Sequence, residues 1–283
     1  MTTDRIDRVL TGDISNTPLS KEYATLREQL ARCGTHTTEF DPKPFDKRAV
    51  EAAKEMWRAR MEVEHRSTTV FAQLASQLME ANASLDAKAV MLRMAYDEMR
   101  HTENCADVLR AMGVEAKVET NVACAPLAVH KGCSPEQRAL RNVIYTTCMS
   151  EMVAVARFVD TLDEMEEPYL RDRTRLLLAD EILHGQFGFH YLTAWKDWLD
   201  QNQDEVRLLE RYLVHAFSVI EDMLAGPPVR RIERTKDEIA LGLPEPERSR
   251  DIFFQTMEHA TVPGLERFGI DAGKSWRERR RLA

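Results

Sequence analysis

Apolar residues recur at steps of three and four along most of the chain from Lys47 onward, which is the spacing of one helical face. Segments with the apolar–polar alternation of a β-strand are nearly absent. The pattern therefore predicts an all-α protein. The expected helices cover about 46–82, 85–112, 135–165, 169–200 and 203–225, and a further short helix covers about 246–261.

Residues that favour helix ends mark the breaks between these segments. Gly113 suits the position after a helix, and Ser134-Pro135-Glu136-Gln137 combines an N-cap, a proline at the first helical position and a capping glutamine. The breaks at Asn82-Ala83-Ser84 and near Pro168 are short and predict two antiparallel helix hairpins. The long segment 114–133 joins the hairpins, which gives a four-helix bundle with one crossover and additional C-terminal helices.

Three regions follow from this pattern. Residues 1–45 are polar, contain three prolines and lack sustained periodicity, so we expect an arm on the surface with short helical pieces near 19–33. Residues 46–225 form the expected helical bundle. Residues 226–283 begin with Gly226-Pro227-Pro228 and are expected to be a helical extension packed on the bundle.

Both hairpins carry the same polar motif, a glutamate on one helix followed by Asp-Glu-x-x-His on the next. In the first hairpin these residues are Glu64 and then Asp97, Glu98 and His101. In the second hairpin they are Glu151 and then Asp180, Glu181 and His184. The two copies indicate an internal repeat.

The helical phase places the motif on the buried faces. The four apolar stripes are Trp57, Met61, Glu64, Thr68, Phe71, Leu74 and Leu78; Met91, Met94, Glu98, His101, Cys105, Val108 and Met112; Leu140, Ile144, Thr147, Cys148, Glu151, Val155 and Phe158; and Leu170, Thr174, Leu177, Glu181, His184, Gly188 and Tyr191. Four carboxylates and two imidazoles therefore occupy positions where a bundle normally has Leu or Val.

Buried carboxylates without partners cost several kcal/mol or become protonated. A pair of metal ions removes that cost, and bundles build such centres from a glutamate on each of four helices with two histidines. Glu64, Glu98, His101, Glu151, Glu181 and His184 are the predicted metal ligands and catalytic groups. Oxygen-rich ligands with two imidazoles favour iron or manganese over a metal that prefers thiolates.

Metal-bound imidazoles usually have their second nitrogen held by a carboxylate or carbonyl. Asp97 and Asp180 each precede a predicted ligand, so we expect each to bond the histidine of the opposite hairpin, Asp97 to His184 and Asp180 to His101. The alternative is that both are exposed residues on a helix flank.

Several neighbouring residues admit two interpretations. Glu62 and His65 also form Glu-x-x-His, but Glu62 lies on the polar side of its helix, and His65 is either a second partner of the site or a core residue. Cys105 and Cys148 fit small apolar packing or the lining of a pocket. Thr147 either faces bound oxygen or bonds back to its own helix.

The doubled motif resembles that of the ferritin-like di-iron carboxylate oxidases and oxygenases. These include bacterial multicomponent monooxygenase hydroxylases, p-aminobenzoate-type N-oxygenases and the ribonucleotide reductase small subunit. The resemblance covers about 46–200 and implies a ferritin-like bundle, two iron ions or an iron–manganese pair, and O2 as co-substrate. It assigns the six residues as ligands and Asp97 and Asp180 as their outer partners.

Some features of these families are missing or displaced. The four-cysteine domain of rubrerythrins is absent, and the reductase small subunit usually has an aspartate where this chain has Glu64. Tyr96 and Tyr145 lie off the buried stripes, which argues against a radical tyrosine. A third histidine ligand occurs in some N-oxygenases, but His190 is out of phase with His184 on its helix, and the sequence does not place His215.

The composition of the chain bears on its binding partners and on its location in the cell. The net charge of −8 argues against nucleic-acid binding. No apolar run approaches the roughly 20 residues of a membrane span, and the N-terminus lacks a signal-peptide pattern. The five cysteines show no disulfide or zinc spacing. We expect a cytoplasmic protein, as a homodimer.

Three functions fit these observations. The first is a di-iron oxygenase or oxidase that hydroxylates, N-oxygenates or desaturates a small organic molecule, with electrons from a reductase or ferredoxin, since no flavin or dinucleotide fingerprint is visible. The second is a ferroxidase or iron-storage protein. The third is a helical interaction protein with a vestigial site.

Overall fold

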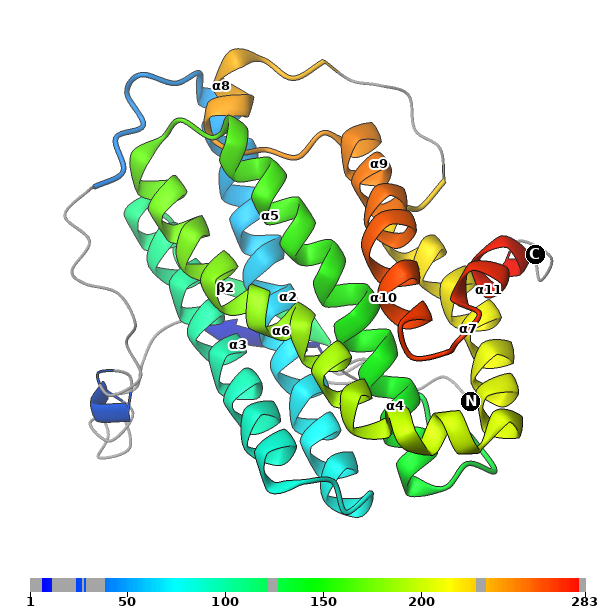
Figure 1. Cartoon of the computed structure of the whole chain (residues 1–283). Coiled ribbons are helices and arrows are strands. Elements are labelled where there is room, and N and C mark those ends of the chain that lie inside the picture. The colour runs from blue at the N-terminus through cyan, green and yellow to red at the C-terminus, as the bar shows by residue number, and fades with distance from the viewer. Residues whose placement is uncertain are drawn as a thin grey trace.

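The computed structural model describes residues 7–11, 24–26, 28, 39–121, 127–227 and 233–279. Helices dominate it, in keeping with the all-α prediction (Figure 1). The bundle consists of α2 (Lys47–Glu80), α3 (Leu85–Ala111), the continuous helical segment α4 (Pro135–Val143), η1 (Ile144–Glu151) and α5 (Met152–Glu164), and α6 (Pro168–Gln201). The predicted bounds of these helices are confirmed to within two residues.

The bundle is two helix hairpins. Residues 81–84 turn the chain between α2 and α3, and residues 165–167 turn it between α5 and α6. The long segment between α3 and α4 is the crossover. Helix α3 also packs on α6 and α2 on α4, so the two hairpins share one interior.

Local sequence signals start these helices. The Asp46 side chain accepts a hydrogen bond from the Arg48 N–H at the start of α2. Ser134 and Gln137 form the predicted capping box of α4. Glu167 accepts from the Leu170 N–H before α6. Each cap satisfies a backbone donor that would otherwise lack a partner at the helix start.

A short strand pair was not predicted. Strand β1 (Asp7–Thr11), in the N-terminal arm, pairs antiparallel with β2 (Lys117–Asn121), in the crossover, with Asp7 opposite Asn121. In β1 the apolar residues Val9 and Leu10 are adjacent, and in β2 the one apolar residue is Val118. Neither strand shows the apolar–polar alternation that predicts a strand, which is why the pattern missed them. Of the helical pieces expected near 19–33, residues 24–26 and 28 are helical, and the others lie outside the described residues.

The middle of the third bundle helix differs from the α-helix that the sequence predicted. Its centre, η1, is a π-helix, in which hydrogen bonds span five residues. The sequence predicted a continuous α-helix here, because the residue types of this segment suit an α-helix and a π-helix equally. Such wide turns are rare and occur frequently at functional sites.

The C-terminal region covers one side of the bundle (Figure 1). It comprises α7 (Gln203–Leu224), α8 (Lys236–Ala240), α9 (Pro246–Thr256), η2 (Met257–Thr261), α10 (Val262–Glu266) and α11 (Ala272–Glu278). The expected helices 203–225 and 246–261 are present, whereas the short α8 and α11 were missed. Helix α9 packs on α5, and α11 packs on α7. The proposed three-region division stays a prediction.

The apolar core is split into two clusters. On α2, Met61 belongs to one cluster and Phe71 to the other. On α6, Leu177 and Phe187 are divided in the same way. Polar residues of the repeated motif lie between the members of each pair. Within the described ranges, no helix combines the length and apolar character needed to cross a membrane.

Candidate metal centre

The six predicted ligands converge in the layer between the two apolar clusters. They come from four helical segments: Glu64 from α2, Glu98 and His101 from α3, Glu151 from the last position of η1, and Glu181 and His184 from α6. None of the six is more than 8% exposed. The inward orientation predicted from helical phase is therefore confirmed, while their role as ligands stays a prediction.

The side chains form two overlapping groups that could each hold a metal ion. One group is Glu64, Glu98, His101 and Glu181, and the other is Glu98, Glu151, Glu181 and His184. In each group one possible ligand atom per residue lies within 4.8 Å of all the others. Glu98 and Glu181 belong to both groups, so each could offer one oxygen to either ion.

Both histidines turn the same nitrogen toward the carboxylates. Nδ1 of His101 lies 3.2 Å from Glu181 Oε1 and 3.4 Å from Glu64 Oε2. Nδ1 of His184 lies 3.0 Å from Glu98 Oε1 and 3.3 Å from Glu181 Oε2. Each Nδ1 is therefore the nitrogen placed to bind a metal.

Several of these buried atoms have no hydrogen-bond partner within the described structure. They are both carboxylate oxygens of Glu98, Oε2 of Glu181, and Nδ1 of His101 and His184. An unsatisfied buried polar group costs about 1–3 kcal/mol, and more if it is charged. Two divalent cations would carry four positive charges against the four carboxylates of the groups. The donor set fits a pair of metal ions.

Burial and the charges of neighbouring groups shift the pKa values of the carboxylates. Burial raises the pKa of Glu64 to about 7, although the close contact with His101 opposes the shift. Burial also raises the pKa of Glu151, and the charges of Glu181 and Glu98 add to the rise. For Glu181, burial alone would raise the pKa, but the two neighbouring imidazoles hold it well below its usual value.

The pKa values of the two histidines are shifted in the direction opposite to that of ordinary buried imidazoles. Burial would lower the pKa of His101, but its contacts with Asp180, Glu181 and Glu64 raise it well above its usual value. Glu181 and Asp97 raise the pKa of His184 against burial in the same way. Without metal, the centre therefore holds protons that metal ions must displace.

The outer nitrogens of both histidines face aspartates of the opposite hairpin. Nε2 of His101 lies 3.4 Å from Asp180 Oδ2, within hydrogen-bond range. Nε2 of His184 lies 3.8 Å from Asp97 Oδ2, a longer contact. Both aspartates are buried. The predicted bond is therefore confirmed for Asp180 and His101, whereas Asp97 faces His184 beyond hydrogen-bond distance. The alternative of exposed flank residues is wrong for both aspartates.

Two arginines hold these aspartates from outside. Arg93 Nε donates to Asp97 Oδ1 at 2.7 Å, and Arg100 Nη1 donates to the same oxygen at 2.9 Å. Arg100 also reaches Asp180 Oδ2 at 3.4 Å. Burial would raise the pKa of Asp97, but the contacts with His184 and Arg93 lower it. Asp97 is therefore a carboxylate that can accept the His184 N–H.

The simpler interpretation holds for the neighbouring residues except His65, which is not a core residue because it is partly exposed. Glu62 and His65 are partly exposed and belong to neither group. Cys105 and Cys148 are buried in the two apolar clusters. The Thr147 hydroxyl donates to the Val143 carbonyl at 2.7 Å, which is the bond back to its own helix.

Residues considered for other roles lie outside the centre. His190 and His215 are exposed, and neither described group contains a third histidine. The Tyr145 hydroxyl contacts Met223 Sδ, on α7, rather than a motif residue. Tyr96 is partly buried and also belongs to neither group.

Gly188 allows the π-helix to lie close to α6. It follows His184 by one turn, and a Cβ atom there would overlap Thr147 Oγ1 and Cys148 Sγ. Both atoms belong to η1, the segment that ends at Glu151. The close approach at Gly188 therefore involves the same helical segment that carries Glu151.

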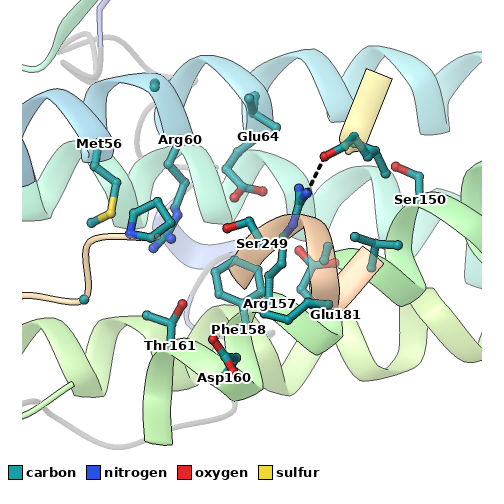
Figure 2. Close-up of a pocket in the computed structure, with 18 of the residues that line it drawn as sticks. Met56, Arg60, Glu64, Ser150, Arg157, Phe158, Asp160, Thr161, Glu181 and Ser249 are labelled. Carbon is teal, nitrogen blue, oxygen red and sulfur yellow. Dashed lines mark hydrogen bonds between the residues drawn. The ribbon is translucent and has the colours of Figure 1, made fainter. Parts of the chain in front are cut away.

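A cavity of about 530 Å³ adjoins the carboxylates (Figure 2). Glu64, Glu98, Glu151 and Glu181 line its inner end. Apolar side chains line much of the remainder, among them Val63, Val153, Phe158 and Ile252. Val63 is 46% exposed, so the cavity connects the buried carboxylates with the surface.

The sequence analysis missed the arginines of this cavity. Arg60 lies one turn before Glu64 on α2, and Arg157 reaches in from α5 (Figure 2). The four-residue step from Arg60 to Glu64 was a usable signal, since it places both on one face. The distant segment 234–252, which completes the cavity, left no such signal.

Comparison with known proteins adds no assignment: no protein-family model matches the chain, and no curated protein matches it.

Proposed function

We propose that this protein is a di-iron oxygenase or oxidase that uses O2 to oxidise a small organic molecule by hydroxylation, N-oxygenation or desaturation. One observation carries the proposal. Two possible metal groups share Glu98 and Glu181, and their carboxylates line the inner end of a largely apolar cavity. A bare metal-binding protein has no need of such a cavity beside its ions.

The chain's own residues would divide the work of holding two ions. Glu64 and His101 would bind one ion, Glu151 and His184 the other, and Glu98 and Glu181 both. Oxygen-rich ligands suit iron, and manganese remains an alternative for one position. When bound, a pair of iron ions supplies the electron transfer that activates O2.

The other side chains would orient the ligands and keep the centre dry. Asp180 holds the outer nitrogen of His101 and so fixes the ring with Nδ1 toward the carboxylates. Asp97 faces the outer nitrogen of His184 at the longer distance of 3.8 Å. Phe158 and Val153 give the cavity apolar walls, which exclude water from a reactive centre.

The electron balance implies a second protein. Hydroxylation places one oxygen atom of O2 in the product and reduces the other to water, which consumes two electrons and two protons from a donor. We place that donor in a separate reductase or ferredoxin, because the sequence shows no flavin or dinucleotide motif. The homodimer and the cytoplasmic location expected from the sequence belong to the same proposal.

A test is to load the protein anaerobically with a twentyfold excess of Fe(II), add O2, and follow iron oxidation, O2 uptake and visible absorption by rapid mixing. We expect a transient absorption and oxidation of about two iron ions per chain, with further turnover only when a chemical reductant is supplied. Continued oxidation into a mineral particle would instead establish the ferroxidase, and absence of any O2 reaction would establish a vestigial site.

A further inference from the structure

We propose that the cavity beside the candidate metal centre binds an organic acid, whose carboxylate pairs with Arg60 and whose apolar body extends toward Glu64 and Glu151. The suggestion that this acid is the compound oxidised rests on the proposed function. Recognition of the acid does not, because it depends on the cavity alone.

The charged side chains in the outer part of the cavity have partners outside its lining. Asp160 accepts two hydrogen bonds from Arg248, at 2.9 and 2.6 Å. Glu245 caps the start of α9 through the Glu247 and Arg248 N–H groups. Arg234 donates to Glu164 at 2.6 Å and to the Leu243 carbonyl at 2.8 Å.

Arg60 and Arg157 are the remaining cations. Arg157 donates to the Leu224 carbonyl at 2.6 Å, which is a neutral partner. Arg60 has no carboxylate within ion-pair distance among the described residues, and its Nη1 is buried with no hydrogen-bond partner there. Glu64 and Glu181 influence it only through space, and bound metal ions would take up their charge.

The arginine is held in a way that suits a carboxylate. Its guanidinium carbon lies 4.6 Å from the centre of the Trp57 ring and 4.9 Å from that of Phe158. Both rings lie within cation–π distance of the guanidinium and hold it in place, while its Nη1 keeps no hydrogen-bond partner among the described residues. A guanidinium matches a carboxylate with two parallel hydrogen bonds, and an arginine already held in place loses less entropy on binding.

The spacing between Arg60 and Glu64 indicates how far the bound acid must extend to reach the metal ligands. Arg60 and Glu64 are four residues apart on α2, which corresponds to about 6 Å along the helix axis. Figure 2 shows both side chains projecting from α2 into the same space, with Phe158 reaching it from α5. A molecule anchored at Arg60 would place atoms one turn away beside the metal ligands, across the apolar surface of Phe158 and Val153.

The test is equilibrium binding by titration calorimetry to manganese-loaded protein. The probes are straight-chain carboxylates of four to ten carbons and monocyclic aromatic carboxylates, each compared with its neutral amide. We expect at least one acid to bind at least tenfold more tightly than its amide. Arg60→Met should abolish that preference, whereas Arg66→Met, an exposed arginine on the same helix, should retain it.

Equal binding of acids and amides would overturn the proposal, as would an unchanged preference in Arg60→Met, which would mean that the acids bind the metal directly. Thermal unfolding and metal content verify that the variant is folded, and Arg60→Gln serves if Arg60→Met is not. The readout involves no O2 chemistry. Acid preference without O2 reactivity would contradict the proposed function alone, and O2 reactivity without acid preference would contradict this inference alone.

Discussion

Asp180 Oδ2 lies 3.4 Å from Nε2 of His101, across the interface between the two hairpins. Asp97 faces His184 in the reverse direction, and Arg100 contacts both aspartates. Each hairpin thus supplies a histidine to the candidate centre and a carboxylate that faces the other hairpin's histidine. The candidate metal centre and the contact between the two hairpins therefore involve the same residues.

Replacing either aspartate should weaken metal binding without unfolding the bundle. We expect Asp97→Asn and Asp180→Asn each to lower manganese affinity by roughly 10- to 100-fold, the usual range for groups that orient a ligand. Asp197→Asn, an exposed position on α6, is the matched control. Affinities are measured by competition with a chelator, and wild-type values in both variants would show that the two contacts do not orient the ligands.

A methyl group at Gly188 should disturb both stability and the centre. Gly188→Ala places a Cβ against Thr147 and Cys148 in η1, and overpacking of this kind costs about 1–3 kcal/mol. Gly185→Ala, one turn earlier, meets the flexible Met152 thioether instead and should be close to neutral. Denaturant unfolding of metal-free protein measures the two losses, and equal values would show that the close approach at Gly188 is unimportant.

The metal-free protein should lose stability as the pH rises from about 5 to 8. Because the pKa of Glu64 is raised to about 7, the folded state binds more protons than the unfolded state between about pH 4.5 and 7. The raised pKa values of His101 and His184 act in the same direction, since their stabilisation is lost as the pH passes through them.

Unfolding temperatures with a chelator present measure this effect, and Glu64→Gln should reduce the slope of unfolding temperature against pH.

Manganese binding should also release protons, at least one per chain at pH 6 and fewer above pH 7. Calorimetry in buffers of different ionisation enthalpy measures this release. Metal binding without proton release at pH 6 would mean that the carboxylates and imidazoles are not the ligands.

Glu64 and Glu62 test the helical phase of α2. Glu64 is buried in the first metal group, whereas Glu62, two residues earlier, is partly exposed and outside it. Glu64→Gln should therefore lower metal occupancy at one site, and Glu62→Gln should change neither occupancy nor stability by more than about 0.5 kcal/mol. If Glu62 proved essential and Glu64 silent, the buried face of α2 would have to be redrawn.

The centre could be predicted from the sequence because each helix carries its own phase information. Steps of three and four residues place Glu64, Glu98 and Glu181 on buried faces, and the fold confirms all three. The crosswise pairing of Asp97 and Asp180 also followed, since two hairpins of equal design bring each aspartate to the other's histidine.

The remaining features depend on contacts between distant segments. The π-helix carries no distinct residue pattern, and its close approach to α6 rests on Gly188, whose role shows only when η1 lies against it. The cavity needs Arg234 and Ser249 from the C-terminal region beside Arg60. The strands β1 and β2 are short and far apart in sequence, so neither predicts the other.

Metal stoichiometry tests the central claim most directly. The protein is reconstituted anaerobically with Fe(II), freed of unbound metal, and analysed for iron per chain alongside Glu98→Ala and Glu181→Ala. We predict about two iron ions per wild-type chain and the loss of at least one in each variant, because both carboxylates belong to both groups. A wild-type chain that binds no iron, or variants that retain two ions with unchanged spectra, would contradict a di-metal centre built from these residues.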